Sequence, residues 1–316
     1  MRYIEEFKEG ETIVGHYFCK KRQTGKTRAG KNYLSLTLGD KTGRIEAKVW
    51  ELSNQIQSFE ENDYIKIDGE VQAYNGELQL RVHKIRKSTE GEYDPADYVP
   101  STEQDIDVIM DRLMDYIKSL ANPFIKQLLE NILIHNKEVH EALKWHSAAK
   151  NMHHSYMGGL AEHTLSVVEI CDFMGSRYKY VNRDLLIASA MLHDIGKLFE
   201  LSPFPENDYT DEGQLIGHIV IASDMISEEA AKIPDFPEQL KNLLKHCILA
   251  HHGEYEFGSP KRPKIIEAFI LHCADNADAK IKMFEDAIDK DNTQGYWVGY
   301  HRMLARNIRK SDYKVK

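Results

Sequence analysis

The chain has 316 residues, of which 42% are hydrophobic, and it carries a formal net charge of −9. This length suits about two domains, and the apolar fraction is sufficient for a packed core. Charged residues interrupt the apolar stretches before they reach the roughly 20 residues of a membrane span, and the acidic start lacks the apolar run of a signal peptide. Four scattered cysteines without a CxxC pair argue against a disulfide framework or a zinc knuckle. We therefore expect a cytoplasmic protein without a membrane partner.

The charge is unevenly distributed along the chain. Residues 1–87 contain 16 Lys and Arg against 13 Asp and Glu, whereas the remainder contains 25 against 37. A mildly basic first domain and a carboxylate-rich second domain suit an enzyme that acts on a polyanion.

Residues 11–87 are typical of β-structure. Segments with period-two alternation are separated by turns, of which Asn75-Gly76 is a strong hairpin signal. Residues 52–61 look helical. The predicted strands cover residues 12–19, 34–38, 45–50, 63–73 and 78–85. This order predicts a five-stranded barrel over residues 1–87, with a short helix after the third strand.

Residues 36–50 resemble the strand 2–strand 3 hairpin of OB-folds, barrels that bind single strands on this face and its flanking loops. The preceding loop, residues 20–31, carries six cations and no anion, and nearby aromatic rings could stack on bases. The alternative interpretation is that the rings fill the barrel and the loop is merely solvated. The candidate nucleic-acid-binding residues are Lys21, Arg22, Lys26, Arg28, Lys31, Tyr33, Trp50 and Tyr74.

From residue 104 onward the hydrophobic period becomes about 3.6, which is typical of helices. The predicted helices cover residues 106–120, 123–134, 136–146, 158–175, 183–194, 213–230, 236–251 and 263–288. We expect a linker over residues 88–102, an all-α domain over residues 103–300 with its core at 158–288, and a basic tail over residues 301–316. The tail could contact RNA or form a solvated helix end.

His193 and Asp194 end an almost wholly apolar helical stretch. A buried, unpaired aspartate is costly, and a divalent cation removes that cost. Further histidines and an aspartate lie on apolar helical faces downstream and upstream of this pair. The candidate metal ligands are His163, His193, Asp194, His218, His251, His252 and Asp275. Seven such residues are too many for one tetrahedral ion and suit two.

Imidazoles and carboxylates together favour transition-metal ions, whereas an all-oxygen set would favour Mg²⁺ or Ca²⁺. We expect two divalent ions, with Mn²⁺ or Co²⁺ as the first candidates and Fe²⁺, Zn²⁺ or Ni²⁺ as alternatives.

The order H…HD…H…HH…D resembles the HD-domain metal-dependent phosphohydrolases. This resemblance implies that His163, His193, Asp194 and Asp275 hold one ion, and that Asp194 with His218 and either His251 or His252 holds the other. The sequence departs from the cyclic-dinucleotide branch of the superfamily, because residues 253–260 lack a GYP signature. Position 159 is also Gly rather than a third-metal carboxylate.

The whole chain, a barrel followed by this helical domain, is similar to the YhaM family of 3′→5′ exoribonucleases. Residues 148–160, just before the first candidate ligand, belong to this similarity. The resemblance implies hydrolysis of single-stranded RNA to 5′-mononucleotides, with single-stranded DNA as a further candidate substrate. Neither the physiological metal nor a homo-oligomeric state follows from it.

The proposed catalytic residues are Asp194 and Lys197. Two ions would share a water molecule and lower its pKa, and Lys197 would support the non-bridging phosphate oxygens. Lys150, His153 and His154 are candidates for substrate contact, although an ordinary polar segment before a helix explains them equally well.

Two other functions fit parts of the sequence. An HD-type nucleotide or dNTP phosphohydrolase would use the same ions but would leave the basic barrel without a clear purpose. A non-catalytic single-strand-binding protein would use the barrel but would not require the complete ligand set.

Overall fold

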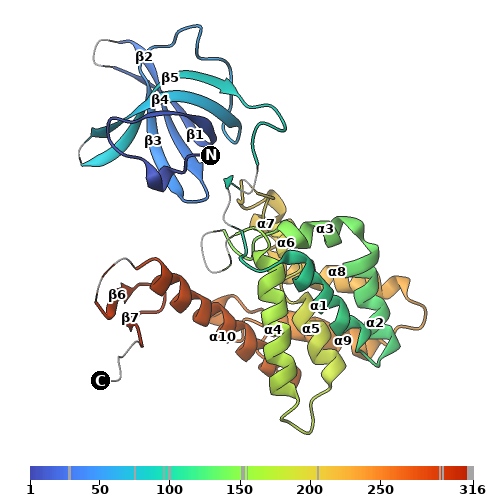
Figure 1. Ribbon diagram of the computed structural model, residues 1–316. Coiled ribbons are helices and arrows are strands. Elements are labelled where there is room, and N and C mark those ends of the chain that lie inside the picture. Colours follow the sequence, from blue (N-terminus) through green and yellow to red (C-terminus); the bar gives the residue numbers. More distant parts are fainter. Residues whose placement is uncertain are drawn as a thin grey trace. The chain divides into compact units, whose positions relative to one another are not determined.

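The computed structural model describes residues 1–311 except residues 28–29, 75, 95–96, 99–100, 151–153, 155, 205, 292 and 294. The chain divides into two compact units, Met1–Ser101 and Thr102–Lys316 (Figure 1). The first is built from strands and the second mainly from helices, which confirms the predicted fold class. In the part of the chain that the structure describes, none of the helices combines the length and the apolar composition that crossing a bilayer requires.

Five strands of the first unit form a closed barrel with the order β1-β2-β3-β5-β4. They are β1 (Thr12–Lys26), β2 (Asn32–Asp40), β3 (Gly43–Val49), β4 (Tyr64–Tyr74) and β5 (Glu77–Lys87) (Figure 1). All neighbours pair antiparallel except β3 and β5, which pair parallel. Leu34, Leu36 and Leu38 of β2 are buried because alternate side chains of a strand point to the same face.

The basic segment at residues 20–31 is mostly strand, so the prediction of a loop was wrong. After a register shift between Cys19 and Lys21, β1 continues along β2 until Lys26 lies opposite Asn32. The turn itself is short, since Thr27 N donates to Lys31 O at 2.8 Å. An exposed strand with polar residues on both faces lacks the alternation by which strands are predicted from sequence.

The short helix predicted at residues 52–61 is also absent from this described segment. Gln57 N instead donates to Ile85 O at 2.9 Å, so the backbone pairs with β5. Phe59 is buried and belongs to the barrel core. Contacts with the barrel therefore override the local helical pattern.

The β4–β5 hairpin has the predicted position. Tyr74 lies opposite Glu77, which leaves a two-residue connection. Its first residue, Asn75, lies outside the described residues, and Gly76 has a φ of +86°. Glycine is favoured at such an angle.

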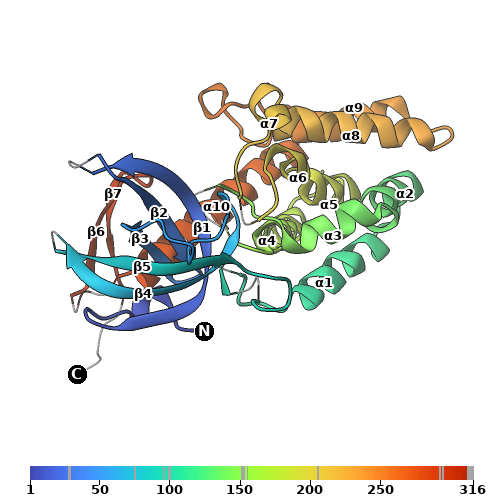
Figure 2. The ribbon, with the colours of Figure 1, turned by 90° about the horizontal axis from the view of Figure 1, so that it is seen from above.

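The second unit is built around α5, whose residues 185–192 are all buried. Helices α4, α9 and α10 pack against α5, and α8 runs beside α9 (Figure 2). The helical elements are α1 (Ile106–Lys118), α2 (Pro123–Glu130), the π-helical turn η3 (Asn131–His135), α3 (Lys137–Trp145), α4 (Gly159–Gly175), α5 (Arg183–Leu192), α6 (Lys197–Glu200), α7 (Asp211–Leu215), α8 (His218–Lys232), α9 (Glu238–Ala250), the 3-10 turn η4 (Tyr255–Phe257) and α10 (Ile266–Asp289).

The single helix predicted over residues 213–230 is broken in the structure. Gly217 separates α7 from α8 with φ +81° and ψ 152°, angles that favour glycine. His218 is therefore the first residue of α8, where a backbone N–H has no partner within the helix. This N–H donates to Glu200 Oε1 at 3.0 Å.

A two-stranded hairpin follows α10, where the sequence predicted the end of an all-α domain and a basic tail. Its strands are β6 (Trp297–His301) and β7 (Arg306–Arg309). Ile308 is buried and anchors the hairpin, whereas Trp297 and Tyr300 are exposed. Strands this short carry too few residues for a period-two pattern to be recognised. Residues 312–316 of the predicted tail lie outside the described residues.

Gly196 allows the backbone after α5 to approach the start of α8. A Cβ atom at this position would lie 2.1 Å from His218 O. We expect Gly196→Ala to lower the free energy of unfolding by about 1–3 kcal/mol through overpacking, measured by thermal unfolding. Gly295→Ala is the matched control, because the nearest described atom would lie 4.0 Å from its Cβ. Equal melting temperatures for the two variants would contradict this account.

Candidate metal centre

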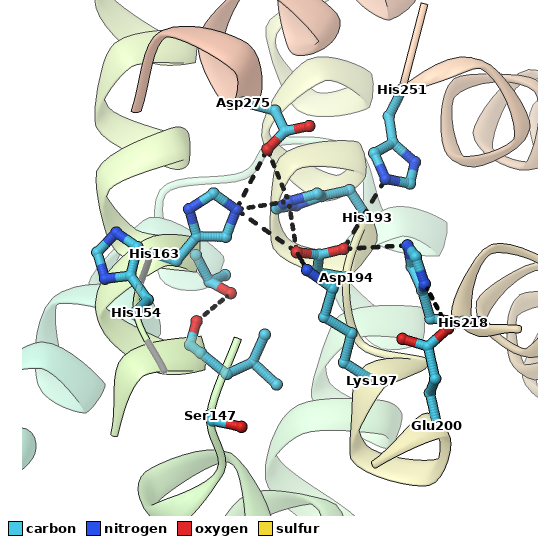
Figure 3. Close-up of polar contacts among 12 residues, drawn as sticks. Ser147, His154, His163, His193, Asp194, Lys197, Glu200, His218, His251 and Asp275 are labelled. Atoms are coloured by element: carbon cyan, nitrogen blue, oxygen red, sulfur yellow. Dashed lines mark hydrogen bonds and ion pairs between the residues drawn. The ribbon is translucent and has the colours of Figure 1, made fainter. Parts of the chain in front are cut away.

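The structure brings all the candidate metal ligands together inside the helical unit. Helices α4 and α10 contribute residues from their inner faces, and α8 contributes its first residue. The remaining ligands follow directly after the last residues of α5 and α9. Figure 3 shows His163, His193, His218, His251 and Asp275 gathered around Asp194. The converging residues are His163, His193, Asp194, His218, His251, His252 and Asp275.

Four donor atoms form a first group. His163 Nε2 lies 3.2 Å from His193 Nε2, 3.5 Å from Asp194 Oδ2 and 3.3 Å from Asp275 Oδ1. His193 Nε2 lies 3.3 Å from Asp194 Oδ2 and 4.0 Å from Asp275 Oδ1. Metal–ligand bonds of about 2.0–2.2 Å place neighbouring donors about 3.0–3.6 Å apart. The spacing of this group is therefore close to that of a single coordination sphere.

The other carboxylate oxygen of Asp194 belongs to a second group. Asp194 Oδ1 lies 3.5 Å from His218 Nε2 and 3.8 Å from His251 Nε2. All three atoms are buried, and none of the described residues gives them a hydrogen-bond partner. Such unsatisfied polar atoms are costly, and a cation between them would satisfy all three. His252 also lies close to this group, with His218 and His251.

The outer ring nitrogens of two histidines are held by the ends of their own helices. His193 Nδ1 donates to Ala190 O at 2.8 Å, and His251 Nδ1 donates to Ile248 O at 2.7 Å. Each bond fixes the tautomer in which Nε2 carries a lone pair directed into the site. Metal-ligating histidines commonly show this arrangement.

Glu200, at the end of α6, is a functional residue that the sequence analysis missed. Its Oε1 accepts from His218 Nδ1 at 2.9 Å and from His218 N at 3.0 Å. Burial raises the pKa of Glu200, but the contacts with His218 outweigh this and lower it, so the carboxylate is ionised. Glu200 thus orients His218, and its position one turn after Lys197 was the available signal.

Asp278 on α10 is a second missed residue. It accepts from His163 Nδ1 at 2.7 Å and from His154 Nε2 at 3.1 Å, and the Ser166 hydroxyl also donates to it. Its position three residues after Asp275 places both carboxylates on one helix face, which the sequence could have indicated.

The prediction that His154 contacts the substrate does not fit the structure. The side chain of His154 is 3% exposed and donates to Asp278 behind His163. The neighbouring candidate for substrate contact, His153, lies outside the described residues.

The electrostatics of the site favour additional positive charge. Burial raises the pKa of Asp194, but Lys197 and the neighbouring histidines hold that pKa well below its usual range. Burial lowers the pKa of His163, but the surrounding carboxylates outweigh this effect and raise it well above its usual value. Lys197 Nζ lies 2.7 Å from Asp194 Oδ2. Loss of solvent lowers the pKa of this half-buried lysine, but the Asp194 carboxylate outweighs that effect and raises it, so the lysine stays charged.

The donor set fits divalent transition-metal ions. Burial and neighbouring imidazoles hold the pKa of His251 well below its usual value, and burial with His218 lowers the pKa of His252. Both rings are therefore neutral, the form that binds a metal. Together with ionised carboxylates and unpartnered Nε2 atoms, they suit ions that accept mixed nitrogen and oxygen ligands.

A cleft of about 610 Å³ opens onto this centre, a size typical of small-molecule sites. Lys197 and Lys150 both line it, and Lys150 forms an ion pair with Asp208. The described lining also includes Asp194, Glu200, His218, His252, Tyr209, Phe257 and Asp275.

The structure brings two of the three candidate stacking residues of the barrel together. The rings of Tyr33 and Trp50 lie 4.9 Å apart, and Trp50 is 43% exposed. Tyr74 is exposed at the β4–β5 turn, opposite Glu77, whereas Trp50 follows the last residue of β3. Neither position matches the alternative in which all the aromatic rings fill the barrel.

The candidate cations of the barrel differ in their surroundings. We call residues 20–31, the end of β1 and its turn into β2, the β1–β2 arm. Lys21, Lys26 and Lys31 are exposed on this arm. Arg22 instead packs over the Phe59 ring at 5.4 Å and lies 3.8 Å from Glu60, so its charge is partly balanced. Arg28 lies outside the described residues.

Comparisons with known proteins agree with both units. Residues 160–280 match the family described as HD domain, and residues 19–87 match the family described as OB-fold nucleic acid binding domain. The chain is 36% identical over 289 residues to a 3'-5' exoribonuclease YhaM of Geobacillus sp. (strain WCH70), covering 91% of this chain and 88% of the relative. The solved second OB-fold domain of replication protein A from Methanococcus maripaludis aligns with 29% of this chain and 98% of its own length, at 18% identity and a TM-score of 0.24.

Replacing Asp278 tests whether the outer layer positions His163. In Asp278→Asn the acceptor for His163 Nδ1 is weakened, so we expect the affinity for Mn²⁺ to fall by about 10- to 100-fold. Isothermal titration calorimetry measures this change, and circular dichroism checks the fold. Asp289→Asn, an exposed aspartate on the same helix, is the matched control. Unchanged affinity in Asp278→Asn would show that this layer does not support metal binding.

Proposed function

This chain belongs to the YhaM family of 3'-5' exoribonucleases, and from that premise we propose that its metal centre hydrolyses the 3′-terminal phosphodiester bonds of single-stranded RNA. The observation that carries the proposal is a set of three buried atoms that lack a hydrogen-bond partner in the part of the chain that the structure describes: Asp194 Oδ1, His218 Nε2 and His251 Nε2. Without a cation, these atoms would be a net cost to folding. With one, they complete a second site beside the first group.

We assign one ion to His163, His193, Asp194 and Asp275, and the other to Asp194, His218 and His251. His251 is preferred to His252 because it is fully buried and its Nε2 faces Asp194 Oδ1. Two divalent ions bound by these residues would supply positive charge to the phosphoryl oxygens and lower the pKa of a water molecule. We propose that both sites hold Mn²⁺ or both hold Co²⁺, since each metal accepts mixed imidazole and carboxylate ligands.

Lys197 is the proposed protein cation at the scissile phosphate. It lines the cleft, and it stays charged because Asp194 raises its pKa. A charged Nζ beside the shared carboxylate could donate to a non-bridging oxygen as negative charge develops there. The contact with Asp194 also keeps the long side chain in place before substrate binds.

We assign capture of the RNA strand to the barrel and hydrolysis to the helical unit. The adjacent Tyr33 and Trp50 rings offer a stacking surface for bases, and the exposed lysines of the β1–β2 arm offer phosphate contacts. Neither contact reads sequence, so this division of labour suits an exonuclease that removes successive nucleotides.

The decisive experiment incubates 5′-labelled and 3′-labelled RNA and DNA strands with the protein and each divalent ion in turn. The expected result is a ladder from 5′-labelled RNA, immediate release of mononucleotide from 3′-labelled RNA, and dependence on Mn²⁺ or Co²⁺. Absence of cleavage with every ion, or a ladder from the 3′-labelled strand alone, would refute the proposal.

Asp194 is the residue whose replacement should be most damaging. We expect Asp194→Asn, which preserves volume, to lower RNA hydrolysis by more than about 100-fold, since losing even an outer-layer partner costs 10- to 100-fold. Metal analysis should show fewer ions bound per chain. Asp224→Asn, on the exposed side of α8, should match the wild type in both assays. Full activity of Asp194→Asn would exclude the shared carboxylate.

The stacking role of the barrel can be measured apart from hydrolysis. In metal-free buffer, we expect Trp50→Ala to weaken binding of labelled single-stranded RNA by about 5- to 150-fold, as loss of about 1–3 kcal/mol of stacking requires. Fluorescence anisotropy gives the dissociation constants. Tyr180→Ala removes another exposed ring, in the helical unit, and serves as control. Identical affinities for wild type and Trp50→Ala would mean that the strand binds elsewhere.

A further inference from the structure

Two exposed aromatic side chains line the cleft that contains the metal centre. Tyr209 is 46% exposed and Phe257 is 62% exposed, and both belong to the same cavity wall as Asp194 and Asp275. Neither ring belongs to the described core of the helical unit. Single exposed aromatic rings are common on protein surfaces, but these two line the same cleft as the metal centre, where a planar group of a ligand could contact them.

Phe257 is fixed relative to the second group of ligands. It ends the 3-10 turn η4, and Gly258 follows with a φ of +82°. The carbonyl oxygen of Phe257 accepts from His252 Nδ1 at 3.0 Å. The backbone of Phe257 therefore orients His252, while its ring stays free to contact a ligand in the cleft.

Tyr209 is fixed through a different connection. It forms an antiparallel bridge with Leu201, and the next residue, Thr210, donates from its N–H to Glu200 O at 3.0 Å. The Glu200 carboxylate in turn holds His218. Both aromatic residues are thus linked by short hydrogen-bonded connections to histidines of one cluster, formed by His218, His251 and His252.

A lysine, Lys150, lines the cleft near Tyr209 and forms an ion pair with Asp208. Lys150 Nζ lies 5.6 Å from the centre of the Tyr209 ring and lines the cleft with it. A ring beside an ammonium group, next to a metal centre, matches a ligand that has a planar base and a phosphate. A nucleotide has both parts.

We propose that Tyr209 and Phe257 form a nucleobase-stacking subsite for a nucleotide that flanks the scissile phosphate. This inference rests on the proposed function and specifies how the same cleft recognises its substrate. Every base has a π-face, so stacking holds the strand end without selecting its sequence. The subsite positions the phosphate by binding the base and takes no part in the chemical step.

The test compares RNA strands that differ only at the 3′ end. One strand is unmodified, and two others carry a stable abasic ribose analogue at the last or the penultimate position. Initial rates at low substrate concentration with Mn²⁺ give kcat/KM for wild type, Phe257→Ala and Tyr209→Ala. Wild type should prefer the unmodified strand by about 5- to 150-fold over at least one abasic strand, and each variant should lose most of this preference.

Two further variants control for structural damage. Tyr255→Ala removes a ring that is 61% exposed in the same 3-10 turn but is not among the described lining residues of the cleft, and it should retain the wild-type preference. Phe257→Tyr, which keeps an aromatic ring at this position, should also retain the wild-type preference for the unmodified strand. The content of bound Mn²⁺ should be the same in Phe257→Ala and wild type, because His252 contacts the backbone of Phe257 rather than its ring.

The outcomes separate this proposal from the function on which it rests. An active wild type without preference for a base at either position would overturn the subsite alone, and so would an undiminished preference in both alanine variants. A wild type that hydrolyses none of the strands with any ion would overturn the exoribonuclease function itself.

Discussion

The carboxylate of Asp194 is almost fully buried, and its two oxygens face two different sets of imidazoles. One oxygen lies among His163 and His193, and the other lies between His218 and His251. A buried negative charge of this kind is stable only where positive charge surrounds it. Lys197 supplies part of that charge, and the arrangement of the remaining donors leaves room for more. The positions of five helices in this unit are consistent with this single requirement.

The ends of three helices determine how the histidine rings of the metal centre are oriented. The last carbonyl groups of a helix lack partners, and two of the ligands use them: His193 bonds to a carbonyl of α5 and His251 to a carbonyl of α9. The same hydrogen bond satisfies the helix and turns the second ring nitrogen inward. His218 stands at a helix start instead, where its free N–H and its ring share Glu200. Backbone geometry thus determines which lone pairs converge.

The ligand order and the two fold classes could be predicted because they depend on residue type and hydrophobic period, which are visible in any sequence. The outer layer could not, because Asp278 and Glu200 look like ordinary helical acids until their partners are placed in space. His154 was misassigned because its closeness to His163 along the chain does not show whether its side chain faces the cleft or packs against Asp278. Gly217 was an available sign of a helix break, but an apolar pattern on both sides of it concealed the interruption.

Residues 185–192 of α5 have no side that faces solvent. Amide hydrogens in such a helix exchange only when the surrounding unit opens almost completely, whereas loops at the cleft open at much lower free energy. The helix that leads into His193 and Asp194 is therefore expected to be among the last parts of the unit to open. Ions bound at these two residues would face the cleft, whose described lining includes residues 148–150, 209 and 257 and none of residues 185–192, so we expect their exchange with solvent to follow the opening of these loops rather than that of the helical core.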